Sequence, residues 1–395
     1  MCRSTPRVAR LLARIPLAGV LLATRRRSSA MATTFIGLNA DQAVQRWSAR
    51  LFVDMAAMAY WTKFEGTSEN SIVHEKVDLK RAAGERILFD LSVRLRGKPT
   101  KGDENIVGRE EKLTFYQDDV YIDQVRHSVS AGGAMSRQRT LHNLRTVARD
   151  RLAEWFAEWR DELYFAYCSG MGPTDIMNED SLLDGPHAGN AFQAPDAAHI
   201  MYAGGATSKA SITTSDILSR DTIERVKTRA DMMNATDPRS MNLRGVQIEG
   251  GEHFVFVMNP HQEYDLRKAV GDGSWLDIQK AAAGAEGRDN PIFKGKSGML
   301  NNVVLHCHKS IRRYDDAGAA QNLPAARALF LGRQAMVVAY GNGSGKTRMN
   351  WREEDANAGN DLNVYCGMIF GVTKTRFDDR DFGVIAVDTY SAAVT

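Results

Sequence analysis

The chain has few cysteines, and they do not occur in pairs. The four thiols, Cys2, Cys168, Cys307 and Cys366, lie far apart in 395 residues and form no CxxC motif. This spacing excludes both a disulfide framework and a zinc knuckle. Reduced and mostly buried thiols in a cytoplasmic setting are the plain interpretation.

Long apolar runs are also missing, and the first thirty residues lack acidic side chains. Residues 1–30 contain seven arginines and no acid, and their apolar stretch 15–24 is too short to span a bilayer. Three arginines stand where a cleavage site would follow, and Met31 then opens "MATTFIGLNADQAVQRW". We expect an upstream-start artefact or a disordered Arg-rich extension, and a targeting segment is the alternative.

The charge of the remaining chain excludes one class of function. The whole sequence carries a formal net charge of +3, whereas residues 31–395 hold 44 basic and 48 acidic residues, a net of −4. Nucleic-acid binding driven mainly by phosphate neutralisation is therefore not expected. The apolar fraction of 43% is that of an ordinary soluble protein with a sizeable core.

One stretch imitates the phosphate-binding loop of nucleotide hydrolases. "YGNGSGKT" (340–347) ends in Gly345, Lys346 and Thr347, but the position that requires the first glycine holds Tyr340. The polar "RMNWREEDANAGND" follows, where such an enzyme has an apolar helix. A turn is the better interpretation. The alternative is a hydrolase that uses Lys346 with Asp388, which ends the apolar "FGVIAVD".

Periodicity predicts helices and strands without regular alternation of the two. The clearest element is a helix of about thirty residues over 137–167, with Ser136 able to cap its start and Gly170 to end it. A charged loop, 98–112, lies inside a long β-rich excursion over 68–129. The predicted class is α+β. Further helices are expected at 41–61, 219–233 and 261–270, strands at 253–260, 298–314 and 362–392, and an apolar segment at 326–340.

The sequence nominates no chemical site. His306 and His308 flank Cys307 and could share a metal ion from one side of a strand, but no further ligand lies near them in sequence. The acids around Arg376–Asp381 suit a solvated turn better than a magnesium site. No nucleophile or zinc-protease motif is present. We therefore assign no catalytic, cofactor-binding or metal-binding residue, and no cofactor.

Three longer stretches carry a family resemblance. "QRWSARLFVDMAAMAYWTKFEG", "GREEKLTFYQDDVYIDQVRHSV" and "CGMIFGVTKTRFDDRDFGVIAVDT" resemble, in that order, the major capsid proteins of N-four-type tailed phages (the gene-product-fifty-six family). "HFVFVMNPHQEYDLR" and "NPIFKGKSGMLNNVVLHCHKS" resemble its central segments. The resemblance covers about 31–392, and it is weaker over 98–109 and 185–215.

The resemblance implies the Hong Kong 97-type phage capsid fold, with an N-terminal arm, an extended β-loop, a peripheral domain with a long spine helix, and an axial domain. The expected division is a leader (1–30), arm (31–66), extended β-loop with flanking strands (67–130), peripheral domain with spine helix (131–215), mainly axial domain (216–361), and C-terminal strands returning to the peripheral domain beside the spine helix (362–395).

The implied function is self-assembly into the icosahedral shell around the double-stranded DNA of a tailed phage or prophage, not catalysis. Implied partners are other copies in hexamers and pentamers, a scaffold, a portal, a decoration protein, and DNA bound without sequence specificity; no membrane is expected. The implied location of the protein is the virion capsid, which would be assembled in the bacterial host cytoplasm. Arg94, Arg96 and Lys98, near the loop tip, are expected to pair with acids of an adjacent subunit. An encapsulin-like cargo compartment is the alternative with the same fold.

Overall fold

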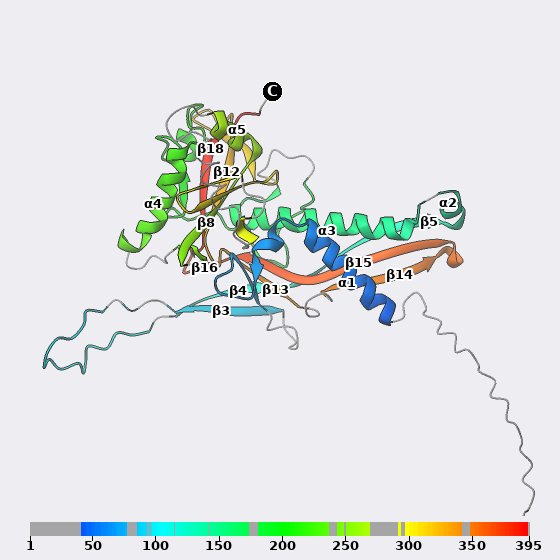
Figure 1. Cartoon of the computed structure of the whole chain (residues 1–395), viewed down its shortest axis with the longest axis horizontal. Helices are drawn as coiled ribbons and strands as arrows, with labels where there is room; N and C mark the ends of the chain where they lie inside the picture. The colour runs from blue at the N-terminus through cyan, green and yellow to red at the C-terminus, as the bar shows by residue number, and fades with distance from the viewer. Residues whose placement is uncertain are drawn as a thin grey trace, which may run out of the picture. The chain divides into compact units, whose positions relative to one another are not determined.

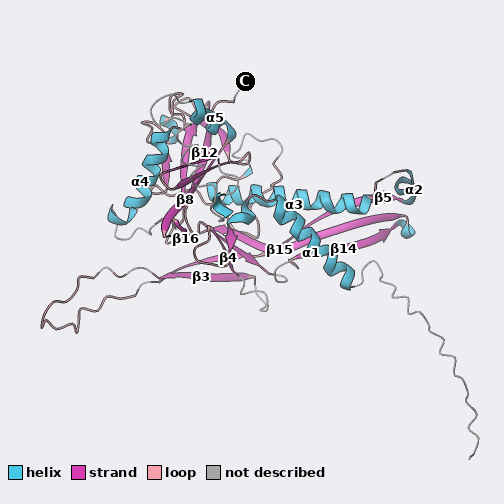
Figure 2. Cartoon of the chain, viewed as in Figure 1, coloured by secondary structure: helices cyan, strands magenta, loops and turns pink. Residues whose placement is uncertain are grey.

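The computed structural model describes residues 41–76, 85–92, 95, 97–113, 115–140, 142–173, 181–236, 243–248, 250–268, 291–293, 297–341 and 348–393. Helices and strands are mixed, as predicted for an α+β protein (Figure 2). The strands form two large sheets, a hairpin and a small two-stranded turn. Within the described part no helix is both long and apolar enough to cross a membrane.

The first sheet has six strands and is covered on one face by two helices. Its long central strand β15 (Asp361–Lys374) pairs on one side with β5 (Asp123–Gly133) and on the other with β14 (Met349–Ala356) and β13 (Met336–Tyr340). β2 (Val73–Lys76) and β1 (Glu65–Gly66) continue the sheet beyond β13. Helices α1 (Asp41–Met58) and α3 (Leu144–Ser169) pack on this sheet (Figure 1).

Tryptophans make the contact between these helices and the sheet. The Trp47 ring on α1 stacks on Trp351 of β14 with 5.6 Å between ring centroids, and Trp155 of α3 stacks on His127 of β5 at 4.1 Å. Trp159 meets Phe370 edge-on. Aromatic side chains bury large apolar areas and add geometric preference, so these pairs set where each helix lies on the strands. The predicted interpretation of the tryptophans as core residues is confirmed.

The long helix is shorter than predicted and begins later. A separate short helix, α2 (Ala134–Arg139), precedes it, so Ser136 lies inside α2 and does not cap the long helix. The cap is Asn143, whose side chain accepts from the backbone N–H of Thr146. Asparagine is a strong capping residue, which explains why the helix starts anew there. The predicted end is confirmed: Gly170 closes α3 in the left-handed conformation at φ 66°.

The second half of α3 is buried all round, which the amphipathic pattern did not predict. Residues 159–169 are all buried because the first sheet covers one side and the second sheet another. Three consecutive charges are therefore paired inside the protein. Arg160 lies 3.4 Å from Glu65, Asp161 accepts backbone N–H groups, and Glu162 binds Arg312 at 3.0 Å. Buried charges require such partners.

The second sheet has eight strands and two buried faces. Its order is β6 (Ile200–Tyr202), β18 (Val384–Tyr390), β12 (Leu323–Leu331), β8 (Gly251–Met258), β10 (Val303–Cys307) and β9 (Gly298–Leu300), with β11 (Arg313–Ala317) on β12 and β7 (Val246–Ile248) on β8. Phe254, Phe256 and Phe330 share a core with α4 (Arg220–Thr236) and α5 (Pro260–Lys268). Val255, Val257 and Leu329 join the core that includes α3. Strands buried on both faces read as continuous apolar runs.

Sheet membership differs from the expected division in two places. β15 lies along α3 as expected for 362–392, but β18 pairs with β12 and β6 in the second sheet. Conversely, β13 and β14 fall inside 216–361 and yet belong to the first sheet. The chain crosses between sheets at the two-stranded turn of β16 (Arg376–Phe377) and β17 (Arg380–Asp381), where Asp378 and Asp379 adopt positive φ. The predicted solvated turn is confirmed for Asp378 and Asp379, which are exposed, but not for Asp381, which is buried and lies 2.7 Å from the Lys374 ammonium.

Candidate assembly surface

The hairpin of β3 (Arg86–Ser92) and β4 (Phe115–Tyr121), with its loop, carries seven of the sixteen large hydrophobic side chains that are exposed in the described part of the chain. Its inner face carries Ile87, Phe89 and Val120, which are buried against Val337 of β13 and Phe377 of the small turn. Phe89 meets Phe377 edge-on at 5.9 Å. An isolated two-stranded hairpin is marginally stable. This inner contact therefore holds the hairpin on the body.

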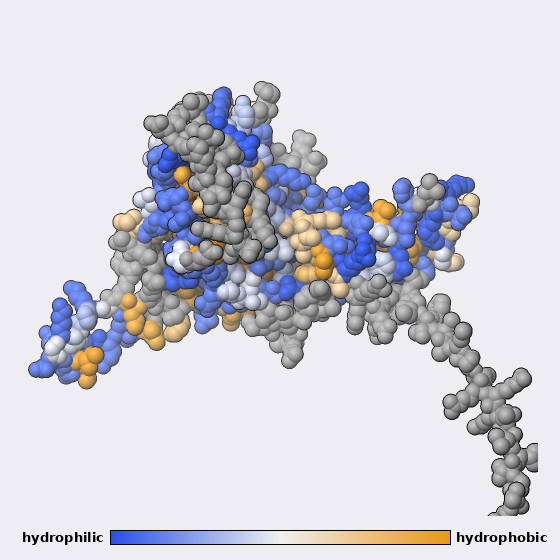
Figure 3. Space-filling model, viewed as in Figure 1, coloured by the Kyte–Doolittle hydropathy of each residue, from blue (hydrophilic) through white to orange (hydrophobic). Residues whose placement is uncertain are grey.

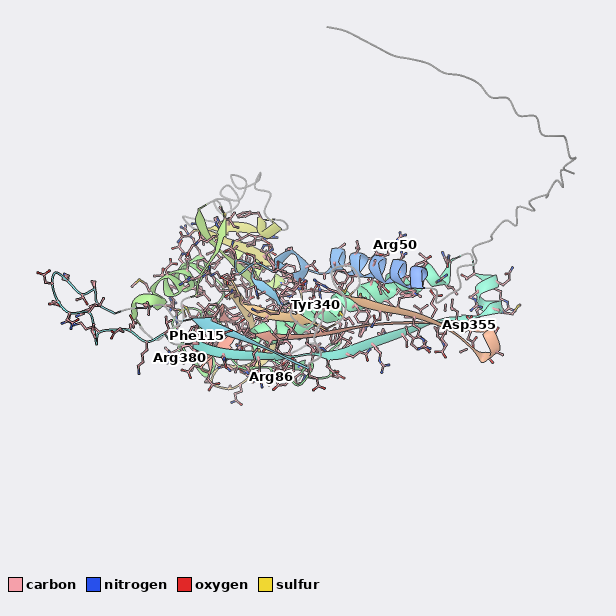
Figure 4. The ribbon with its side chains drawn as sticks, turned by 90° about the horizontal axis from the view of Figure 1, so that it is seen from below. Arg50, Arg86, Phe115, Tyr340, Asp355 and Arg380 are labelled. Carbon is pink, nitrogen blue, oxygen red and sulfur yellow. The ribbon has the colours of Figure 1, made fainter. Side chains whose placement is uncertain are left out.

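The outer face of the same hairpin is uncovered. Leu88, Phe115 and Tyr121 alternate with the buried positions and are 57%, 56% and 40% exposed. Figure 4 shows Phe115 and Arg86 on this hairpin and Asp355 at the opposite end of the view. The alternating pattern predicted this β-rich stretch, but it did not identify Leu88, Phe115 and Tyr121 as exposed side chains. The apolar pair Ile87–Leu88 in "RILFDLS" was the available signal, because adjacent apolar residues in a strand lie on opposite faces.

The loop between the two strands is solvated, as predicted. All of residues 97–113 are exposed except the half-buried Thr100. Ile106, Val107 and Leu113 stand out among its charges at 66%, 74% and 61% exposure, and Figure 3 shows apolar patches there. Lys98 lies exposed on this loop, whereas Arg94 and Arg96 lie outside the described residues. The predicted pairing of these three cations with another subunit therefore stays a prediction.

The uncovered face of the first sheet offers polar and acidic side chains. A groove of about 900 Å³ runs over β5, β15 and β14, lined by Gln124, Arg126, Ser128, Asn350, Arg352 and Tyr365 among others. Glu354, near the end of β14, lines this face, whereas the next residue, Asp355, points to the opposite face. Both acids are exposed and form no ion pair with any residue that the structure describes.

Asp388, the acid of the hydrolase alternative, forms a buried ion pair within the second sheet. Asp388 is fully buried, and both of its carboxylate oxygens accept from the Arg327 guanidinium, at 2.7 Å and 2.8 Å. A magnesium-binding aspartate needs an oxygen that faces the nucleotide. Lys346 lies outside the described residues, and the strand after it, β14, takes the place of the required helix.

The paired histidines are also structural. His306 is fully buried and His308 follows the strand, but both rings contact Tyr60, so they do lie on one side as expected. Burial lowers the pKa of His306 to about 3 and that of His308 to about 4. No group of three or more His, Cys, Asp or Glu side chains suited to a metal ion occurs in the described ranges.

An uncovered hairpin, two sheets and a long helix between them define a subunit that is built to contact other subunits, with no catalytic constellation in the described part. The comparisons agree with this class. The model of the phage capsid protein family matches residues 35–393, and the chain belongs to that family. Its function is that of the major capsid protein of a tailed phage.

Individual relatives support the same conclusion. The chain is 27% identical over 378 residues to the major capsid protein of Pseudomonas phage KPP25, covering 90% of this chain and 96% of the relative. It is 46% identical to the capsid of Ralstonia phage GP4, with a TM-score of 0.81, covering 97% of this chain and all of that one. The capsid of cyanophage Pam1, at 18% identity and a TM-score of 0.64 over 96% of this chain, shares the fold.

Proposed function

We propose that copies of this chain assemble into the hexamers and pentamers of an icosahedral shell that encloses double-stranded DNA, in a phage or prophage of N-four type. Seven of the sixteen large hydrophobic residues exposed in the described part lie between Leu88 and Tyr121, and this concentration is the observation that carries the proposal. Exposed apolar side chains gathered in one part of a protein often mark a surface that meets a partner.

In this proposal the parts have distinct roles. α1 belongs to the arm, the β3–β4 hairpin with its loop is the extended β-loop, and α3 is the spine helix of the peripheral domain with the first sheet. The second sheet with α4 and α5 forms the axial domain. The negative balance of residues 31–395 suits a container, because a strongly basic wall would bind the genome tightly as counterions are released. Assembly would occur in the host cytoplasm with a scaffold, a portal and a decoration protein.

The hairpin of one copy would lie on the uncovered sheet face of the next. The apolar outer side chains Leu88 and Phe115 then lose their contact with water, and burial of one such side chain contributes about 1.5–3 kcal/mol. At the loop, Lys98 with Arg94 and Arg96 would meet Glu354 on this face and Asp355, which is exposed at the same end of β14. Solvent-exposed ion pairs contribute only about 0–1 kcal/mol each, so they would set register more than affinity.

Electron microscopy and light scattering of residues 31–395 test the function directly. We expect shells, sheets, tubes or rings of capsomer size, alone or with the neighbouring scaffold protein. Phe115→Ser should abolish assembly while the thermal unfolding midpoint stays unchanged, because the ring is exposed in the subunit. A chain that stays monomeric with every scaffold, or a Phe115→Ser variant that assembles normally, contradicts the proposal.

The charge pairing has its own test. Lys98→Glu should slow assembly at low salt, and the combination with Glu354→Lys and Asp355→Lys should restore it, since the interaction is electrostatic and screened by salt. The variant with only the two lysines added is the matched control and should be impaired. Equal assembly yields for all of these variants would rule out this contact and leave the role of the apolar face untouched.

A further inference from the structure

The segment that follows α1 is held on the body by the buried rings of Trp61 and Phe64 and by the Glu65–Arg160 pair. One carboxylate and two histidines add contacts that respond to pH. The Asp161 carboxylate of α3 accepts the backbone N–H of Tyr60 at 2.7 Å and that of Trp61 at 3.2 Å. The Tyr60 ring then packs on Phe165 of α3 and on His308, with centroid distances of 5.7 Å and 4.7 Å. Residues 59–66 are therefore held against α3 and the end of β10.

Hydrogen bonding shows which nitrogen of His306 carries the proton. Its Nε2 lies 2.9 Å from the carbonyl oxygen of Ile292, which can only accept, so Nε2 is the protonated nitrogen. Its Nδ1 lies 3.3 Å from Nζ of Lys63, and an ammonium group can only donate. The Nδ1 lone pair must therefore be free to accept, and the ring is neutral.

His308 is held in the same protonation state by a different partner. Its Nδ1 lies 3.2 Å from the backbone N–H of Ser310, which donates. The ring stacks on Phe165 with 4.8 Å between centroids. In both histidines, a second proton would bind Nδ1 and turn it from an acceptor into a donor. The group that faces it, the Lys63 ammonium or the Ser310 backbone N–H, can only donate. For His306 that donor also carries a positive charge.

We propose that His306 and His308 form a proton-operated latch that holds residues 59–66 on the body at neutral pH and releases them in acid. This goes beyond assembly, because the latch lies within one chain and operates without a second copy. The other charged groups near it are Asp161 and Arg160 on α3, Glu65 of the segment itself, the Lys309–Glu158 pair, and Glu263 with Arg267 beside Cys307.

The direction of the pKa shifts determines whether acid favours closure or release of the latch. The pKa of each imidazole is lowered in the closed latch, chiefly by burial, and returns to about 6.5 on release. Closure is therefore fully favoured above about pH 6.5 and weakens as the pH falls. At pH 4.5 each histidine favours release by roughly a hundredfold.

Asp161 opposes the histidines. Burial raises its pKa from 3.8 to about 6, so the closed latch prefers the protonated acid and closure gains a few tens of fold at pH 4.5. The two histidines together outweigh this single acid. The net expectation is release favoured by about a few hundredfold at pH 4.5 relative to pH 7.

Hydrogen exchange of the full chain measures the latch. The protection factor of peptides covering 59–66, corrected for the pH dependence of intrinsic exchange, is compared at pH 7 and pH 4.5 with that of β12. We expect a relative loss of at least thirtyfold in the wild type. The His306→Asn, His308→Phe double variant keeps an acceptor for Lys63 and the ring stack, and should lose less than threefold.

Control variants make each outcome decisive. His142→Phe, which removes an exposed histidine, should behave as the wild type. Should the double variant not fold, Lys63→Met serves instead, and its acid-induced loss should be several-fold smaller because no ammonium then faces His306. Wild-type protection that survives pH 4.5 overturns the latch. So does a loss that persists in the double variant, or one that disappears only in Asp161→Asn.

Discussion

The Arg327–Asp388 pair offers a quantitative test of how the second sheet is joined to the long helix α3. Asp388 of β18 is fully buried, and the guanidinium of Arg327 on β12 donates to both of its oxygens. A third donor of the same guanidinium, Nη1, binds the carbonyl oxygen of Ser169 at 2.9 Å. That oxygen lies at the end of α3, so one side chain connects the second sheet to the long helix.

Asp388→Asn should destabilise the subunit by about 3–5 kcal/mol, because it leaves the Arg327 charge buried without a counter-charge. Replacement of both partners, Arg327→Met with Asp388→Leu, removes the charge as well. It leaves the Ser169 carbonyl without its donor, at a cost of about 1–3 kcal/mol. The double variant should therefore be more stable than the single one.

Urea unfolding of the unassembled chain at pH 7, followed by circular dichroism, measures both values. The matched control is Asp378→Asn, which removes an exposed acid and should change the free energy of unfolding by less than about 0.5 kcal/mol. The reasoning is refuted by a cost below about 1 kcal/mol for Asp388→Asn, or by a double variant that is less stable than the single one.

Three further predictions rest on other contacts. Gly170→Ala should lower the free energy of unfolding by about 3 kcal/mol or more, because φ is 66° and a Cβ would lie 2.1 Å from the Gln193 carbonyl oxygen. Gly102→Ala, at φ 63° with open space around it, should cost only about 1 kcal/mol, and equal costs would contradict the steric argument. Trp47→Ala should cost about 2–3 kcal/mol in urea unfolding through loss of its stack on Trp351 and of the Arg145 guanidinium 4.8 Å away, while Met58→Ala, at an exposed position of the same helix, should be nearly neutral. Burial raises the pKa of the Cys168, Cys307 and Cys366 thiols, that of Cys307 to about 12. Iodoacetamide at pH 8 should therefore label them far more slowly in the folded chain than in urea, as measured by mass spectrometry. Fast labelling of the folded chain would contradict this reasoning.

Local patterns predicted much of the secondary structure, because periodicity and capping residues act within a few positions of the chain. The apolar stripe and Gly170 marked α3 and its end, and the charges of 98–112 marked the solvated loop. The same local logic failed between residues 139 and 144. There the stripe continues, but Asn143 starts a new helix. Tyr340 in place of glycine was sufficient to argue against a phosphate loop.

The sequence alone determined the class of elements, the family resemblance, and the absence of a recognisable chemical motif, since each of these is written in residue types and their spacing. Only the tertiary structure decided which sheet β13, β14 and β18 join. It also decided that Asp388 and Glu162 serve as buried ion-pair partners, and that Leu88 and Phe115 face outward. These features depend on residues 61 to 150 positions apart, or on which face of a strand another element covers. No local pattern contains that information, because burial is set by what the rest of the chain packs against each face.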